Sequence, residues 1–489
     1  MAKRTTVIDI GSNSIRMVVY EKTSRFAFHI LHEAKAKVRL SEDAYKNGGN
    51  LQNLPMQRAY DALDNFLTIS SSLKSRKILC VATSALRDAP NKKIFLKKVS
   101  KNLKLNIKII DGKRESYLGA IACANLLPKQ ENAISIDIGG GSTEFSIINN
   151  DNVKNTISLE LGTVRLKELF FDKGNIKDAI SYIDKKLDTL ETLEPTTIIG
   201  IGGTFRAISN AIMQTNNYPL KKLHSFEGDI SKFKTFLDNI LDADEKQLEL
   251  LNIKSDRFDI IKPGALILSR LLNKLQHIEK FITSGVGVRE GVYLSDLLRN
   301  SKDKFPENYN VSIRYLIDKH IQDINYANQL NKLSKQLFDL TYKHLKVDKK
   351  YRYELATASK LYPVGSNINF YSQNKHSYYL IQGALEYGFT HKEIQLISTL
   401  TRYAKNKLPS TSHIEKYQEL LPPKQNLDAL SYLISLSISL LSHKPRNIDF
   451  SLSFDNGVLK IISSNNLYLT KEAVKKLSNT NDIKIVFDN

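Results

Sequence analysis

The stretch VIDIGSNSIRMVVY at residues 7–20 returns in altered form as SIDIGGGSTEFSII at residues 135–148. In both, a run of strand-forming residues leads into a turn of glycine and small polar residues, and a second such run follows, which predicts a β-hairpin. The two stretches align without a gap and match Asp9 to Asp137 and Arg16 to Glu144. A repeat of about 130 residues is too long for a solenoid and indicates two related subdomains, each opening with a hairpin. We expect both hairpin tips to face one cleft.

Composition limits the kind of protein and its ligands. The 489 residues are 42% hydrophobic and 25% charged, which is typical of a globular protein of several domains. The net charge of +20 favours a polyanionic partner, for which nucleic acid, a phosphate polymer or an anionic membrane would each fit.

Cysteine usage and hydropathy bear on the compartment. Cys80 and Cys123 form no CxxC motif and have no neighbouring His, so we expect reduced core residues. The amino-terminal residues lack the apolar region of a signal peptide, and the serine-interrupted run at 430–441 is too short to span a bilayer. The sequence therefore predicts a cytoplasmic protein without a membrane association.

Strand-like and helix-like segments alternate through the first 300 residues, which predicts the α/β class. Within them, residues 77–91 are expected to form a buried strand ending in a polar loop, and residues 105–112 a further strand. After the polar stretch KDKFPEN the pattern is helical from about residue 307 to 445, and Asp455-Asn456-Gly457 then predicts a type I′ hairpin. We predict subdomains at 1–130 and 131–300 and a helical domain at 307–489.

Glycine-rich loops are the first candidate functional features. The two hairpin tips and the GIGGTFRA turn at 200–207 would expose backbone N–H groups that can bind phosphate oxygens, although tight turns also need glycine. A carboxylate beside such a loop repels phosphate unless a cation intervenes, so Asp137 and Glu144 predict a hard cation such as Mg²⁺. Capping of the turn by these carboxylates is the alternative.

These loops resemble the nucleotide-binding loops of the actin, Hsp70 and sugar-kinase superfamily. Within that superfamily, ATSALRDAPN, GKRESYLG, LELGTVRLKE and VREGVYLSD resemble the exopolyphosphatase and guanosine pentaphosphate phosphohydrolase (Ppx/GppA) family, in order from residue 5 to about 300. The resemblance implies two actin-like, ribonuclease H-like subdomains flanking a cleft. A kinase would not be expected to carry the ATSALR or RESYLG elements.

The resemblance also implies roles for individual residues. It makes Glu115 the base that activates water, Asp137 and Glu144 the metal ligands with Asp9 nearby, and Mg²⁺ or another divalent cation the cofactor. Without the resemblance, Glu115 in the first turn of a helix would be read as a residue that stabilises the helix dipole. The residues expected to bind phosphate are Gly11, Ser12, Asn13, Ser14, Arg87, Gly139, Gly140, Gly141, Ser142, Thr143, Gly202, Gly203, Thr204 and Arg257.

The helical domain resembles the carboxyl-terminal region of the same family, which is related to HD-type metal phosphohydrolases. Tyr326 stands where that element usually begins with His, and Tyr362-Pro363 stands where a His and an acid are expected. The metal-binding dyad is therefore absent, and we expect a non-catalytic lid or dimer contact. The resemblance further implies a homodimer.

The leading hypothesis is an enzyme that removes the terminal phosphate of inorganic polyphosphate, of guanosine pentaphosphate, or of both. Nucleic acid is then not the expected partner. The charge of +20 favours polyphosphate, because affinity from neutralised phosphates grows with chain length. Scattered solubility charges are the alternative explanation. Two other functions stay open, namely an actin-like ATPase or sugar kinase, and a non-enzymatic polyphosphate or nucleotide sensor.

Overall fold

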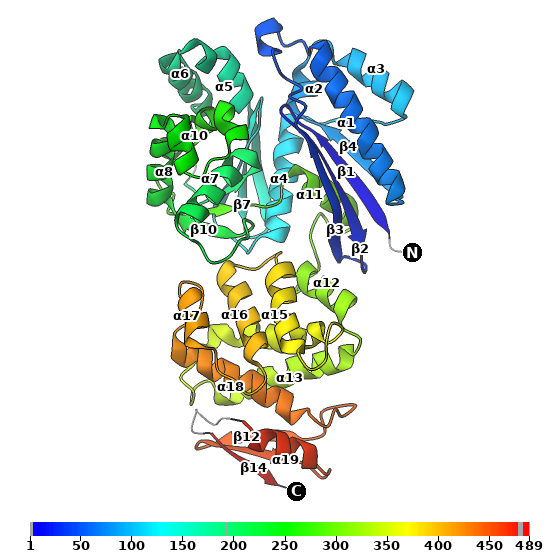
Figure 1. Ribbon diagram of the computed structural model, residues 1–489, viewed down its shortest axis with the longest axis vertical. Coiled ribbons are helices and arrows are strands. Elements are labelled where there is room, and N and C mark those ends of the chain that lie inside the picture. The colour runs from blue at the N-terminus through cyan, green and yellow to red at the C-terminus, as the bar shows by residue number, and fades with distance from the viewer. Residues whose placement is uncertain (1–2, 191–193, 478–482, 489) are drawn as a thin grey trace. The chain divides into compact units, whose positions relative to one another are not determined.

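The computed structural model describes residues 3–190, 194–477 and 483–488. The chain divides into two compact units, Met1–Tyr309 and Asn310–Asn489. The first unit contains two β-sheets with helices packed on them, and the second is mostly helical (Figure 1). The expected combination of an α/β part and a helical part is therefore confirmed.

The amino-terminal subdomain is built on a five-stranded sheet with the order β3-β2-β1-β4-β5. Its strands are β1 (Arg4–Ile10), β2 (Ile15–Lys22), β3 (Phe28–Ala36), β4 (Lys77–Ala82) and β5 (Lys108–Ile109). Its helices are η1 (Tyr45–Asn47), α1 (Asn53–Ser72), α2 (Ser84–Asp88) and α3 (Lys92–Leu103), whereas α4 (Gly112–Leu126), which follows β5, packs on the second sheet.

The second subdomain is built on a six-stranded sheet with the order β10-β11-β9-β6-β7-β8. Its strands are β6 (Ala133–Ile138), β7 (Thr143–Asn149), β8 (Asn152–Leu159), β9 (Thr197–Ile201), β10 (Phe226–Asp229) and β11 (Lys280–Thr283). Its helices are α5 (Thr163–Leu169), η2 (Phe171–Lys173), α6 (Ile176–Leu187), α7 (Gly202–Thr215), α8 (Ile230–Asp242), α9 (Glu245–Leu250), η3 (Ser255–Arg257), α10 (Phe258–Lys274) and α11 (Val288–Leu297).

The two sheets repeat one topology, which confirms the internal duplication. Reading β8-β7-β6-β9-β11 against β3-β2-β1-β4-β5 gives the same strand order, with β10 added at the edge of the second sheet. The pairing registers also correspond, because Asp9 lies opposite Arg16 in the first hairpin and Asp137 lies opposite Glu144 in the second. Helices α4 and α11 pack against each other between the sheets (Figure 1). Both hairpin tips therefore belong to one compact unit.

One local prediction was wrong and another is confirmed only in part. The polar loop expected after the strand at 77–82 is the short helix α2, in which the N–H groups of Leu86 and Arg87 donate to the Thr83 carbonyl. The strand expected at 105–112 is present but short, because β5 pairs with β4 only beside Val81 and Ala82. The turn into α2 also brings Arg87 towards the second subdomain.

The second unit is a helical domain with a small sheet. Its helices are α12 (Val311–His320), α13 (Ile324–Thr341), η4 (Lys349–Tyr351), α14 (Arg352–Leu361), η5 (Tyr362–Gly365), α15 (Gln373–Ala384), α16 (His391–Tyr403), α17 (Thr411–Lys416), α18 (Lys424–Leu440) and α19 (Tyr468–Lys475). Its strands are β12 (Ser451–Asp455), β13 (Val458–Ile462) and β14 (Lys484–Asp488). The expected type I′ turn is confirmed by positive φ angles of 46° at Asn456 and 79° at Gly457.

Helix α18 runs through the middle of this unit. Its apolar side chains, among them Leu430, Leu433 and Leu436, are fully buried in a single core with the other helices. The run at 430–441 is therefore a core helix rather than a membrane segment. Among the described residues, no helix is long and apolar enough to cross a bilayer. Cys80 and Cys123 are both buried and free, as expected.

Candidate active site

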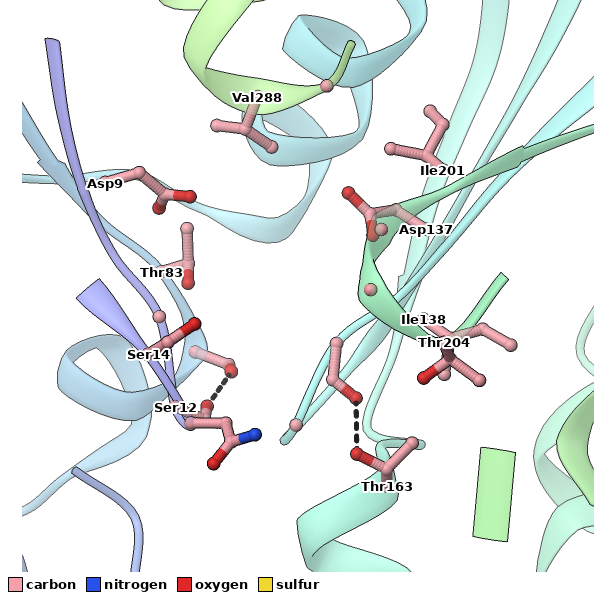
Figure 2. Close-up of a pocket in the computed structure, with 18 of the residues that line it drawn as sticks. Asp9, Ser12, Ser14, Thr83, Asp137, Ile138, Thr163, Ile201, Thr204 and Val288 are labelled. Carbon is pink, nitrogen blue, oxygen red and sulfur yellow. Dashed lines mark hydrogen bonds between the residues drawn. The ribbon is translucent and has the colours of Figure 1, made fainter. Parts of the chain in front are cut away.

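A cleft of about 160 Å³ lies between the two subdomains of the first unit. Figure 2 shows Asp9 and Asp137 on opposite walls of this cleft, with Ser12 and Ser14 on the first hairpin and Thr204 after the third glycine loop. Segments that are far apart in the sequence, including the amino terminus of α11 at Val288, thus meet at one place. The expectation that both hairpin tips face one cleft is confirmed.

The glycine loops lie too close to their neighbours to carry side chains. A Cβ atom on Gly140 would stand 2.8 Å from the Cβ of Ser12, across the boundary between the subdomains. Gly202 has a φ of +83°, and a Cβ there would collide with the Asp137 carboxylate. The N–H groups of Gly11 and Gly139 close their own hairpin turns by donating to the carbonyls of Ser14 and Ser142, and the glycines leave room for an anion beside the remaining loop amides.

Glu115 enters the cleft from the first turn of α4. The helix begins after Asp111, whose carboxylate accepts a hydrogen bond of 2.7 Å from the N–H of Arg114. The Glu115 side chain is 10% exposed, and its Oε2 accepts a hydrogen bond of 2.8 Å from Nη1 of Arg87. Burial raises the pKa of Glu115 well above its usual value, the Glu144 carboxylate raises it further, and Arg87 opposes both. Arg87 thus favours the ionised form of a buried carboxylate.

Three further carboxylates line the same cleft as Glu115, of which Glu144 is buried and Asp9 and Asp137 are partly buried. Burial raises the pKa of Asp9 to about 6 and that of Glu144 to about 7, and it also raises the pKa of Asp137. Oδ1 of Asp9 is buried without a hydrogen-bond partner among the described residues, whereas Glu144 accepts a hydrogen bond of 2.8 Å from Ser158. Concentrating so much negative charge out of water is unfavourable unless a cation compensates for it.

These residues fit a divalent cation that is held in part by other ligands. In the part of the chain that the structure describes, no three His, Cys, Asp or Glu side chains gather closely enough to hold a metal ion by themselves. Mg²⁺ normally keeps several waters and takes only one or two protein carboxylates together with phosphate oxygens. The orphaned oxygen of Asp9 and the buried Asp137 and Glu144 carboxylates match that requirement.

Cationic side chains line the rest of the cleft. Arg16, Lys35 and Arg257 make no hydrogen bond or ion pair through their charged groups with any described residue, although Arg16 and Arg257 are largely buried. The Arg257 guanidinium lies 3.0 Å from the place that a Cβ on Gly203 would occupy, so it lies against the third glycine loop. Unpaired buried cations are unfavourable alone and indicate an anionic ligand.

Two more arginines of the cleft are anchored. Arg206 donates a hydrogen bond of 2.8 Å to the carbonyl of Ser284, and Arg289 donates one of 2.7 Å to Glu33. Burial lowers the pKa of Arg206 to about 10, and the neighbouring Arg16 and Arg289 lower it further. These fixed guanidinium groups add to the positive potential of the pocket without being free to reorient.

The structure brings most of the predicted site residues to this pocket, and three lie outside its lining. Arg87 contacts Glu115, as described, and its Nη2 donates to Ser142 at 3.4 Å. The Thr143 hydroxyl donates to the carbonyl of Leu161 and is fully buried, and Gly141 lies against Tyr45 and Ser84. The predicted residues that line the pocket are Asp9, Gly11, Ser12, Asn13, Ser14, Glu115, Asp137, Gly139, Gly140, Ser142, Glu144, Gly202, Gly203, Thr204 and Arg257.

Sequence reasoning missed four cations of the pocket, namely Arg16, Lys35, Arg206 and Arg289. The signal for Arg16 was present, because the repeat places it at the position that Glu144 occupies in the second hairpin. Arg206 and Arg289 stand within the quoted GIGGTFRA and VREGVYLSD elements. Lys35 is on β3, and nothing in its local sequence distinguishes it from a surface lysine.

Two duplicated α/β subdomains enclose the cleft, which is typical of the actin-like fold class. The glycine loops, the unpaired arginines and the buried Glu115 of this cleft suit a phosphohydrolase. Residues 18–300 match the model of the Ppx/GppA phosphatase family, and residues 310–478 match that of Ppx/GppA phosphatase, domain III. The chain belongs to the Ppx/GppA phosphatase family, and it is a hydrolase.

Curated relatives differ in how much of them the chain covers. It is 30% identical over 286 residues to a bifunctional 3-dehydroquinate synthase/phosphatase of Fusobacterium nucleatum, which covers 54% of this chain but only 42% of that protein. It is 24% identical over 486 residues to a guanosine-5'-triphosphate,3'-diphosphate pyrophosphatase of Photobacterium profundum, which covers 96% of this chain and 92% of that protein.

Solved structures agree with the fold of the first unit. The Ppx/GppA family member of Aquifex aeolicus is 25% identical and has a TM-score of 0.54, covering 62% of this chain and 99% of its own. An exopolyphosphatase of Cytophaga hutchinsonii is 23% identical with a TM-score of 0.57, and it covers 62% of this chain and 100% of its own. The predicted family and fold class are thus confirmed.

Proposed function

We propose that the protein hydrolyses the terminal phosphoanhydride bond of guanosine pentaphosphate, of inorganic polyphosphate, or of both. The observation that carries this proposal is the convergence of a buried Glu115, three further carboxylates and three glycine loops on one cleft. The names of a pyrophosphatase relative and of an exopolyphosphatase structure support these two substrates. Both substrates present a terminal phosphate on a chain of phosphoanhydrides, so one cleft can serve both.

Glu115 is the proposed general base. A water molecule attacks the terminal phosphorus, its proton passes to the Glu115 carboxylate, and the bond from phosphorus to the bridging oxygen breaks, which leaves the shortened chain and inorganic phosphate. The base must be ionised to accept the proton. Arg87, which donates to Oε2 at 2.8 Å, favours that form against the effects of burial and of the Glu144 carboxylate, and it fixes the orientation of Glu115.

The remaining groups bind and neutralise the substrate. Loop amides at Gly140 and Gly203 would hold phosphate oxygens, and the unpaired Arg16 and Arg257 would pair with further phosphate groups. Asp137 and Glu144, with Asp9 nearby, would hold the divalent cation. When bound, that cation neutralises charge on the phosphate oxygens as a Lewis acid.

The unpaired cations of the cleft favour a substrate with several negative charges. Five cationic and four carboxylate side chains line the cleft, and Arg16, Lys35 and Arg257 make no ion pair with any described residue. A cytoplasmic location and a homodimer, both expected from the sequence, stay predictions. The following experiment separates the proposed function from the alternatives, because a kinase, an ATPase or a non-enzymatic sensor is not expected to release phosphate from these two substrates.

Phosphate release would be measured from long-chain polyphosphate and from guanosine pentaphosphate, side by side with one preparation. We expect Glu115→Gln to bind substrate but to hydrolyse about 10²- to 10⁴-fold more slowly, the usual contribution of general base catalysis. Glu131→Gln, an exposed position in the same unit, is the matched control and should leave the rate unchanged. A Glu115→Gln variant with more than half of the wild-type rate would remove Glu115 from the mechanism.

A further inference from the structure

The helical unit contains a second cavity, which no motif predicted and which shares no residue with the cleft of the first unit. Its volume is about 560 Å³, and it is formed where several helices end. The contributing segments are the start of α13, the turn η5 with the residues after it, and the ends of α16 and α18. Tyr326 and Tyr362, the two residues that stand where metal ligands were sought, both line it.

The inner part of the cavity is apolar and aromatic. Tyr362 and Pro363 are buried, and Leu441 and Ala404 add fully buried aliphatic surface. The Tyr326 side chain is partly buried, and its hydroxyl makes no hydrogen bond with any described residue. A largely apolar space that contains aromatic side chains and an available phenolic hydroxyl suits a planar ring that carries polar atoms at its edge.

The rim of the cavity is cationic. The Lys444 ammonium lies 4.3 Å from the centre of the Tyr326 ring, and Lys405 donates a hydrogen bond of 2.6 Å to the carbonyl of Tyr371. Both lysines are exposed, and neither is paired with a carboxylate among the described residues. An ammonium group has three donors, so Lys405 can still bind a ligand.

Among the described residues that line the cavity, Asp323 is the one with a carboxylate, and this carboxylate caps a helix. It is the N-cap of α13, and its Oδ1 accepts a hydrogen bond of 2.9 Å from the N–H of Tyr326. The balance of charge at the rim is therefore two lysines against one carboxylate that is engaged with the helix backbone. This balance favours an anion at the rim.

We propose that this cavity binds a small aromatic anion of the size of a purine nucleoside monophosphate. The planar ring lies against Tyr326 and Phe370, whose side chain is 64% exposed, and the phosphate lies at Lys405 and Lys444. Small-molecule sites typically enclose 300–1,000 Å³, with mostly apolar and aromatic walls and a few polar groups that fix orientation, and this cavity matches that description. The proposal is independent of the function proposed for the cleft.

Calorimetric titration of the full chain with guanosine 5'-monophosphate tests the proposal. The titration uses an Arg16→Ala, Arg257→Ala background, which removes the unpaired arginines of the cleft so that binding there contributes little. We expect this protein to bind the probe. Adding Lys405→Ala and Lys444→Ala should weaken binding about tenfold or more, since each lost charge-assisted contact weakens affinity. Lys375→Ala with Lys392→Ala, two exposed positions of the same unit that do not line the cavity, should change nothing.

Further ligands and variants test the two parts of the site separately. Guanosine lacks the anion and ribose 5-phosphate lacks the ring, so each should bind more weakly than the nucleotide. Tyr326→Phe keeps the ring and should keep most of the affinity, whereas Tyr326→Leu should lose it. The proposal is overturned if the nucleotide does not bind in the cleft-deficient background, if the lysine changes match their controls, or if ribose 5-phosphate binds equally well.

Discussion

Arg87→Ala is the change that tests most directly how the cleft prepares its base. Arg87 lies outside the pocket lining, and the shortest hydrogen bond of its side chain is that of 2.8 Å to Oε2 of Glu115. Burial and the Glu144 carboxylate raise the pKa of Glu115, and Arg87 lowers it. Removing Arg87 therefore raises the pKa of Glu115 further, so less of the base is ionised at a given pH.

The size of the effect follows from the contact that is lost. A hydrogen bond to a charged group contributes about 1.5–3 kcal/mol, and about 1.4 kcal/mol corresponds to a factor of ten. We expect kcat/KM to fall about 10- to 100-fold at pH values below the pKa of Glu115, and to recover as the pH rises. Arg87→Lys keeps a positive charge, so its kcat/KM should lie between the values of the wild type and of Arg87→Ala.

The assay is phosphate release over a range of pH, with kcat and KM determined separately. Arg114→Ala is the control, since Arg114 neighbours Glu115 in α4 but donates to Ser295 at 2.8 Å. We expect the acidic limb of the plot of kcat/KM against pH to move to higher pH in Arg87→Ala and to stay in place in Arg114→Ala. A uniform rise in KM at every pH, with the limb in place, would refute the reasoning and make Arg87 a phosphate contact only.

Three further predictions concern the divalent cation, the pH dependence of stability and the hydrogen bonds that Glu168 accepts. Mg²⁺ should raise the Tm of the wild type in a thermal melt and raise it less in Asp137→Asn, and excess chelator should abolish phosphate release; full activity in chelator would contradict this. Burial raises the pKa of Glu354 to about 7 from an ordinary 4.5, so its stabilising contribution is present below 4.5 and is lost as the pH rises through 7. The free energy of unfolding by denaturant should fall over that window, and Glu354→Gln should flatten the dependence. Glu168→Ala removes the acceptor of two backbone hydrogen bonds, from Asp43 at 2.9 Å and Tyr45 at 3.2 Å, and should cost about 1–3 kcal/mol of unfolding free energy, whereas the exposed Glu160→Ala should cost less than about 1 kcal/mol.

The sequence by itself determined the architecture of the first unit and the ends of its functional loops. The repeat of Asp9 and Asp137 predicted two related hairpins, and the glycines at 139–141 and 202–203 marked tight turns. Signals of this kind are local, because turn chemistry and the alternation of apolar residues act over a few neighbouring positions. Features of this kind can therefore be predicted from the order of the residues alone.

The tertiary structure alone decided which side chains meet. Arg87 and Glu115 are 28 residues apart, and their contact depends on α2 forming where a loop was expected. Arg16 and Arg257 come from different subdomains and share the cleft only because α4 and α11 hold the two sheets together. The cavity at Tyr326 likewise arises where four helix ends leave space. Such long-range packing has no local pattern, since it depends on the summed shapes and charges of elements far apart in the chain.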